Sequence, residues 1–205
     1  MEKEIFTYNI IESPSEGLYK EKGSKFLAFA YPVADETEIL NHLDRINKHY
    51  HDARHRCYAY RLGIEESRTK TNDDGEPTHT AGKPILGQIE AFQVTNIIIF
   101  VVRYFGGTLL GKGGLIRAYK SAAQDALQNA TIKSKTIDEV YQLHFSYDNL
   151  DEIMKILDKY KLKPIETQFG ETCTAKYKVP RNKAIHIKDL FKPFPNCHVQ
   201  YLYTE

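Results

Sequence analysis

The sequence predicts an α+β protein of two domains, because its two halves differ in texture and each alternates between helical and strand-like patterns. Residues 1–132 hold most of the glycines and one dense polar, glycine-rich stretch, whereas residues 137–205 alternate between short elements. The polar residues 131–136 are expected to form a linker or a short connecting strand. At 205 residues, 41% of them hydrophobic, the chain is long enough for two small domains with real cores.

The first domain begins with a strand followed by a helix. Residues 25–33 are expected to form the strand. Asp35, with Glu38 three residues later, has the spacing of a capping box, and apolar residues at helical spacing follow until about Tyr50. Residues 55–63 then alternate, as a strand with two unlike faces does.

The rest of the first domain is predicted to contain two helices around a buried strand. Pro84 fits the first turn of a helix. The continuous apolar run of residues 96–102 is typical of a strand that is buried on both faces. After a glycine-rich loop, a second helix with one apolar side is expected from about Gly114.

The second domain is predicted to follow the order βαββαβ, which is the ferredoxin-like plan. Asp148 is expected to cap its first helix, and Gly170 to form a tight turn between the two middle strands. The strands are expected at residues 140–147, 163–169, 172–179 and 198–203, and the second helix at about 183–191.

Charge and cysteine content favour a cytoplasmic protein that has no cofactor, metal or membrane anchor. The 28 basic and 27 acidic residues give a net charge of +1, which argues against a basic nucleic-acid arm or a polybasic anchor. The three cysteines are far apart and form no CxxC pair, so reduced thiols are expected. The charged N-terminus leads into no signal-like apolar region, and residues 97–102 are too few to span a bilayer.

An acidic stretch at residues 72–84 is the first candidate site. Asp74 and Glu76, beside Asp73, can bind a cation or act as acid and base. The alternative is a turn at Asp74 and Gly75 with no chemical role. For His49, His51 and His55, a metal site and ordinary surface histidines are likewise both open, the latter being favoured.

A glycine-rich stretch at residues 103–119 is the second candidate. Backbone N–H groups at the start of a helix attract anions, and Arg103, Lys112 and Arg117 can add charge-assisted bonds to a phosphate or carboxylate. A tightly packed structural loop is the alternative. The stretch also contains Tyr104, Phe105, Gly106, Gly107, Gly111, Gly113 and Gly114.

Enzymatic activity is not expected, although residues 106–112 match the GxxxxGK core of a P-loop. The next residue, Gly113, has no hydroxyl group for a magnesium ion, and no later apolar strand ends in a suitable aspartate. We therefore expect no hydrolysis of ATP or GTP. The sequence offers no serine or cysteine nucleophile in a known motif, and the catalytic residues stay unknown.

Taken together, these stretches resemble the YigZ/IMPACT family. The motifs occur in the family's order and span nearly all of the first segment, and the second segment looks like the smaller C-terminal domain of bacterial members. His79 departs from the pattern, because a glycine is expected before Thr80. The motifs are residues 22–26 (KGSKF), 53–60 (ARHRCYAY), 73–77 (DDGEP), 80–84 (TAGKP) and 102–119 (VRYFGGTLLGKGGLIRAY).

The resemblance implies a fold and a biological setting. The first domain should resemble domain 2 of ribosomal protein S5, also seen in ribonuclease PH, and the second the last domain of elongation factor G. Eukaryotic IMPACT acts in translational control, so the expected partners are RNA, the ribosome or a translation-related protein. The alternative function is an enzyme or sensor for a small phosphorylated ligand held between the two candidate stretches.

We expect one binding site where those stretches meet, with His55 and Thr80 beside the acidic and basic residues. In the alternative arrangement, arginines and carboxylates only pair to hold the loops together. A separate RNA-facing surface is predicted on the second domain, where Lys176 and Lys178 lie on an open, mildly positive sheet face.

Overall fold

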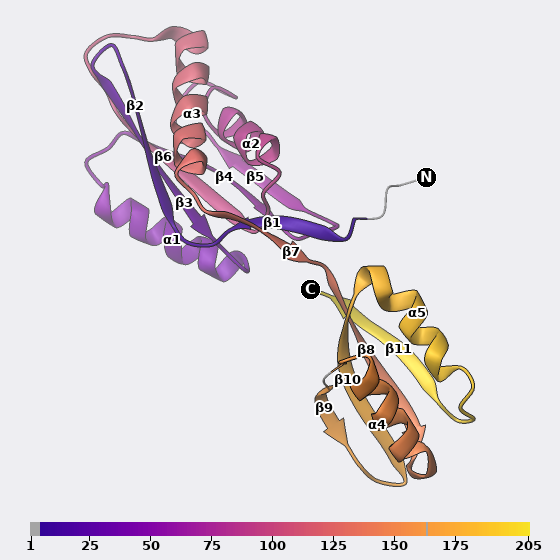
Figure 1. Ribbon diagram of the computed structural model, residues 1–205. Coiled ribbons are helices and arrows are strands. Elements are labelled where there is room, and N and C mark those ends of the chain that lie inside the picture. Colours follow the sequence, from indigo (N-terminus) through magenta and orange to yellow (C-terminus); the bar gives the residue numbers. More distant parts are fainter. Residues whose placement is uncertain (1–4, 163) are drawn as a thin grey trace. The chain divides into compact units, whose positions relative to one another are not determined.

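The computed structural model describes residues 5–162 and 164–205 (Figure 1). The chain divides into two compact units. One comprises Tyr8–Lys135, and the other comprises Thr136–Glu205 together with the described residues up to Thr7. Within the described ranges, no helix combines the length and apolar character needed to cross a membrane.

A five-stranded antiparallel sheet forms the centre of the Tyr8–Lys135 unit. Its strands follow the order β2-β3-β6-β4-β5. The middle strand is fully buried from Ile97 to Val102, and Arg103 is only 6% exposed, which confirms the predicted two-sided burial. The strands are β2 (Ser15–Glu21), β3 (Ser24–Pro32), β6 (Ile97–Tyr104), β4 (His55–Leu62) and β5 (Arg68–Asn72).

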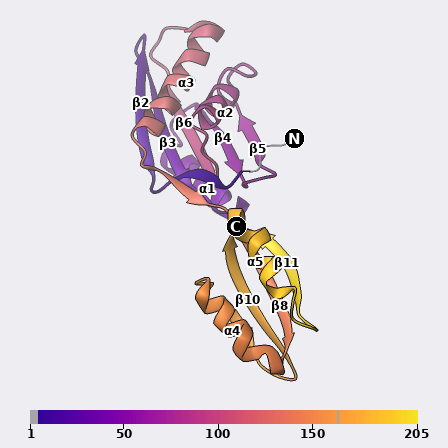
Figure 2. The ribbon, with the colours of Figure 1, turned by 45° about the vertical axis from the view of Figure 1, so that its right-hand side comes forward.

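Helices cover both faces of this sheet (Figures 1 and 2). α2 (Gly82–Ala91) and α3 (Gly111–Gln128) pack on one face, and α1 (Glu36–His49) packs on the other. The side chains of β3 alternate between the two faces of the sheet, so this strand contributes to the core under α3 and to the core under α1. Ala28 and Ala30 leave room for α3, whereas Phe29 lies in the core under α1.

The predicted start of α1 is confirmed, with one difference in detail. Asp35 Oδ1 accepts a hydrogen bond from the Glu38 N–H at 2.9 Å, as in a capping box. The Glu38 carboxylate reaches back to the N–H of Ala34, at 2.8 Å, and not to that of Asp35. The helix ends at His49, with Tyr50 as its C-terminal cap, close to the expected end near Tyr50.

Of the two possibilities stated for residues 131–136, the structure has the connecting strand, β7 (Ile132–Thr136), which pairs with β1 (Thr7–Ile11). Other elements differ from the sequence-based expectation. β2 and β5 were not expected, because charged and polar residues dominate these edge strands and weaken the strand pattern. α3 begins at Gly111 and not near Gly114, so Lys112 and Gly113 lie in its first turn.

The second unit contains the expected order of strands and helices, and its sheet has the antiparallel order β11-β8-β10-β9. The predicted core face of Cys173, Ala175, Tyr177 and Val179 is confirmed. The elements are β8 (Asp138–Ser146), α4 (Leu150–Lys159), β9 (Pro164–Gln168), β10 (Thr172–Pro180), α5 (Arg181–Phe191) and β11 (His198–Thr204).

The prediction that Asp148 caps α4 is wrong. Asp148 lies inside a 3-10 turn, Tyr147–Asn149, that precedes the helix. The cap residue of α4 is Asn149, and its side chain makes no capping hydrogen bond. The predicted strand beginning at residue 163 starts at Pro164, and residue 163 itself lies outside the described residues.

The contact between β2 and α3 generates a stability prediction. A Cβ added at Gly17 would lie 2.3 Å from the backbone nitrogen of Ala126, so Gly17→Ala must push the helix off the sheet. We expect a loss of at least about 2 kcal/mol in the free energy of unfolding. Gly87→Ala is the matched control, because a Cβ there meets nothing within 4 Å, and it should stabilise helix α2 by about 0.5–1 kcal/mol. Equal effects of the two variants in urea unfolding would contradict this packing.

Candidate functional site

The loop between β6 and α3 is held against the turn between β2 and β3. A Cβ at Gly106 would lie 1.9 Å from the carbonyl carbon of Gly23, so only glycine permits this approach. The N–H of Gly106 also donates to the Ser24 hydroxyl at 3.1 Å. Gly107 and Gly111 have φ values of 86° and 69°, which glycine adopts without strain. These contacts set the path of the chain into α3.

The side chain of Asp73, in the loop before α2, caps the N-terminus of that helix. One carboxylate oxygen accepts from the N–H groups of Ala81 at 3.0 Å and Gly82 at 2.8 Å, and the other accepts from the N–H of His79 at 2.8 Å. Partial burial alone would raise the pKa of this carboxyl, but the three backbone donors outweigh it and lower the pKa below its ordinary value. Asp73 is therefore a structural anion.

Asp74 ties the same loop to β4. Its carboxylate accepts from the N–H of Arg56 at 2.7 Å, and its backbone carbonyl lies 2.8 Å from Nδ1 of His55. Thr80 likewise bonds within the loop, where its hydroxyl donates to the carbonyl of Pro77 at 2.6 Å. His79 adopts φ 66°, so the expected glycine position is indeed left-handed, and here a histidine occupies it.

Glu76 is the buried centre of the loop. Its Oε1 accepts from Nη1 of Arg103 at 2.6 Å and from the hydroxyl of Tyr119 at 2.8 Å. The two charged side chains are only 4% and 6% exposed. Burial is the main reason why the pKa of Tyr119 is raised, so its hydroxyl keeps its proton and remains a donor to Glu76.

Cys57 adjoins this network. Its thiol donates to the carbonyl of Asp73 at 3.0 Å and lies 3.4 Å from the hydroxyl of Tyr119. Burial raises the pKa of this thiol far above its ordinary value, with the nearby carboxylates adding to the effect. A thiol that holds its proton so firmly is a poor nucleophile.

A cavity of about 440 Å³ opens beside the Glu76–Arg103 pair at the start of α3. It brings together six of the predicted site residues, namely His55, Glu76, Arg103, Phe105, Gly111 and Lys112. Its other lining residues are Arg54, Gly75, Pro77, Leu109, Leu110 and Leu115, which were not among the predicted site residues.

The remaining predicted residues lie outside the cavity lining. Arg117 is exposed and pairs at 3.2 Å with the mostly buried side chain of Glu21, and the hydroxyl of Tyr104 donates to Asp52 at 2.8 Å. Tyr104 belongs to the core cluster under α1, on the opposite face of the sheet from α3. Asp73, Asp74, Thr80, Gly106, Gly107, Gly113 and Gly114 shape the surrounding loops or the first turn of α3 without lining the cavity.

The cavity carries surplus positive charge. Arg103 is neutralised by Glu76, but among the described residues neither Arg54 nor Lys112 forms an ion pair. The first turn of α3 contains no acidic residue, and its cap residue, Leu110, supplies no capping hydrogen bond. The helix start and two cations therefore favour an anion in this cavity.

The histidines and the C-terminal lysines have other local partners. His51 Nδ1 lies 3.2 Å from the carbonyl of Lys48. In the part of the chain that the structure describes, no three His, Cys, Asp or Glu side chains come close enough together to hold a metal ion.

On the second unit, Lys176 pairs with Glu166 at 2.9 Å and Lys178 pairs with Glu205. These acids offset the positive charge predicted for that sheet face, and an RNA contact there stays a prediction.

Comparison with known proteins gives matches over most of the chain. Residues 22–127 match the model of the Impact N-terminal domain family. The chain is 33% identical over 186 residues to IMPACT family member YigZ of Escherichia coli, covering 90% of this chain and 91% of that protein. It is 34% identical over 96 residues to human Protein IMPACT, covering 44% of this chain and 29% of that protein.

A solved structure described only as a hypothetical protein is similar in fold over the full length. It has a TM-score of 0.72 and 27% sequence identity, and the match covers 98% of this chain and 99% of that one.

The buried pair between the two loops generates a second stability prediction. Glu76→Ala leaves the Arg103 guanidinium buried without its partner and should cost about 3–5 kcal/mol in the free energy of unfolding. The control Glu12→Ala breaks an exposed pair and should cost less than about 1 kcal/mol. Arg117→Ala, whose partner Glu21 is 18% exposed, should cost less than Glu76→Ala. Chemical denaturation of the three variants measures these effects, and a Glu76→Ala loss as small as that of the control would contradict a structural role for the pair.

Proposed function

Because the chain belongs to the IMPACT family, we propose that it is a cytoplasmic binding protein linked to translation, whose Tyr8–Lys135 unit holds a phosphate group of RNA at the start of α3. The observation that carries the proposal is the cavity of about 440 Å³, in which an uncapped helix start meets two cations without ion-pair partners among the described residues.

The loop acids do not compete with a bound phosphate. Asp73 and Asp74 accept backbone hydrogen bonds, and Glu76 is neutralised by Arg103. The N–H groups of the first helical turn then act with Arg54 and Lys112 on an incoming anion.

The apolar wall of the cavity supports a nucleotide unit over a bare anion. Phe105 is 49% exposed and Leu109 is 83% exposed. The Arg103 guanidinium lies 5.6 Å from the centre of the Phe105 ring. An exposed ring of this kind can stack a base or a ribose while the phosphate lies on the helix start.

The setting in translation rests on the family and on the domain types that we assign. We infer an S5-like domain for the first unit and a ferredoxin-like domain for the second. The order β11-β8-β10-β9, with its strand-helix-strand-strand-helix-strand connectivity, supports the second assignment. Both domain types occur in proteins of the translation apparatus.

A small phosphorylated ligand is the second candidate. The same helix start and cations would recognise its phosphate, and a volume of about 440 Å³ is within the usual range for small-molecule sites. Binding assays with a short single-stranded RNA and with a set of phosphorylated metabolites distinguish the two candidate functions. Tight, salt-dependent binding of RNA favours the first, and stabilisation by one metabolite alone favours the second.

Removing one cavity cation should weaken RNA binding. We expect Lys112→Ala and Arg54→Ala each to weaken binding of a short single-stranded RNA about tenfold at low salt, and to reduce the salt slope by about one. Lys120→Ala is the matched control, because Lys120 is an exposed cation of the same helix that does not line the cavity. Fluorescence anisotropy against salt concentration measures both quantities. Equal affinity of all three variants and the unsubstituted protein would reject this cavity as the contact.

A further inference from the structure

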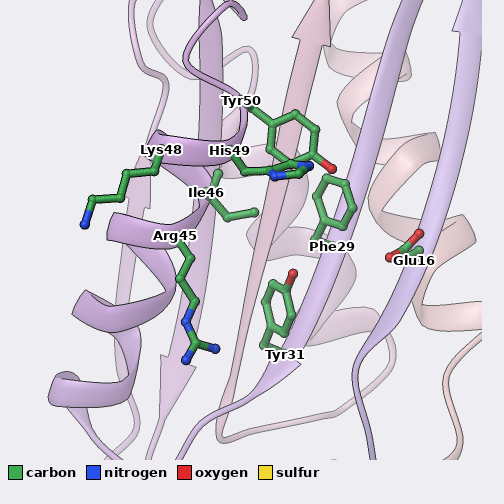
Figure 3. Close-up of a pocket in the computed structure, with 8 residues that line it drawn as sticks. All are labelled: Glu16, Phe29, Tyr31, Arg45, Ile46, Lys48, His49 and Tyr50. Atoms are coloured by element: carbon green, nitrogen blue, oxygen red, sulfur yellow. The ribbon is translucent and has the colours of Figure 1, made fainter.

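A second cavity, of about 580 Å³, lies in the Tyr8–Lys135 unit where α1 packs beside β3 and the edge strand β2. It shares no lining residue with the cavity at the start of α3. Figure 3 shows Phe29 and Tyr31 on β3, with Glu16 on one side and Arg45 and Ile46 of α1 on the other. We call this second cavity the α1 hollow.

Aromatic rings line the α1 hollow. Phe29 and Tyr50 lie with ring centres 5.1 Å apart, and the ring of His49 meets Tyr50 edge-on at 4.7 Å. Tyr31 stacks on His42 at 4.2 Å, which fixes its plane. Preorganised rings of this kind present faces on which a planar ligand can stack.

Polar groups of both signs surround these rings and lack partners. Within the described part of the chain, no hydrogen bond or ion pair engages the Glu16 carboxylate, the Arg45 guanidinium or the hydroxyls of Tyr31 and Tyr50. Lys48 differs, because it pairs with Asp44 at 2.6 Å and points away from the rings in Figure 3.

The four groups act on one another through the α1 hollow. Burial and then the charge of Glu16 raise the pKa of the Tyr31 hydroxyl, while Arg45 lowers it. Burial and Glu16 also raise the pKa of Tyr50. Tyr31 therefore lies within the fields of an anion and a cation, and a ligand there meets an acceptor on one side and a cation on the other.

We propose that the α1 hollow binds a purine nucleotide whose base carries an amino group, as guanine does. The base stacks on the partly exposed rings of Tyr31 and Tyr50, while Phe29 is buried and packs against Tyr50. Its amino edge donates to the Glu16 carboxylate, and its phosphate is bound by Arg45. A simple cation fits less well, because Arg45 opposes it, and a simple anion is opposed by Glu16.

The site differs in kind from the cavity at the start of α3. There the surplus charge is positive and the backbone N–H groups of a helix start are available. Here no helix start contributes, and one anion faces one cation across aromatic rings. The α1 hollow is thus suited to recognise a base, and this inference does not depend on the function proposed for the other cavity.

Titration of the full chain with three probes, GMP, guanosine and UMP, followed by amide NMR, tests the proposal. GMP should produce saturable shifts at Glu16, Tyr31 and residues 45–50. Guanosine, without phosphate, should bind about tenfold more weakly, and so should UMP, whose base has no amino group. Shifts confined to residues 111–113 would place the nucleotide in the other cavity and overturn the proposal.

Two variants test which residue binds the base of the ligand and which binds its phosphate. Glu16→Gln should weaken GMP about tenfold and remove its advantage over UMP, whereas Arg45→Gln should lower GMP to the affinity of guanosine. Glu12→Gln and Arg68→Gln are the matched controls, because both residues form exposed ion pairs outside the α1 hollow. Unchanged GMP affinity in Glu16→Gln, or equal binding of GMP and UMP by the unsubstituted protein, would overturn the proposal.

Discussion

The buried ion pair between Glu76 and Arg103 is the interaction on which the candidate site depends. It joins the acidic loop to the end of β6, and Tyr119 extends it to α3. Two charges removed from water must be matched closely, since each is costly to bury alone. Because Arg103 neutralises Glu76, the cavity beside the pair has no unpaired carboxylate in its lining, and Arg54 and Lys112 set its charge. One structural pair therefore explains both how the acidic loop is joined to β6 and α3 and why the charge beside it is positive.

The two faces of the central sheet differ because side chains alternate along its strands. On β3, Ala28 and Ala30 face α3, which lies close enough that β2 requires Gly17. Phe29 and Tyr31 face the other way, toward α1, and the space beside them becomes the α1 hollow. Small residues on one face thus permit close helix packing, and large rings on the other face leave an aromatic surface at the sheet edge.

Much of the fold could be predicted from sequence, because strong local patterns dictated it. The apolar run of β6 and the capping box before α1 are examples. β5 could not be predicted, since no apolar residue marks it, and it is specified by pairing with β4. For the site, the sequence pattern grouped His55, Arg103 and Lys112, and the structure places all three in the lining of one cavity. It missed Arg54 as a lining residue and the α1 hollow entirely, because only tertiary packing places Glu16 near Tyr31.

The central claim is that Glu76 and Arg103 stabilise the loops through each other. A double-mutant cycle with Glu76→Gln, Arg103→Met and the combined variant measures that coupling directly in urea unfolding. The account predicts that each single variant costs about 3 kcal/mol or more, and that the combined variant costs less than their sum by at least about 2 kcal/mol. Additive losses, with a coupling energy near zero, would contradict it.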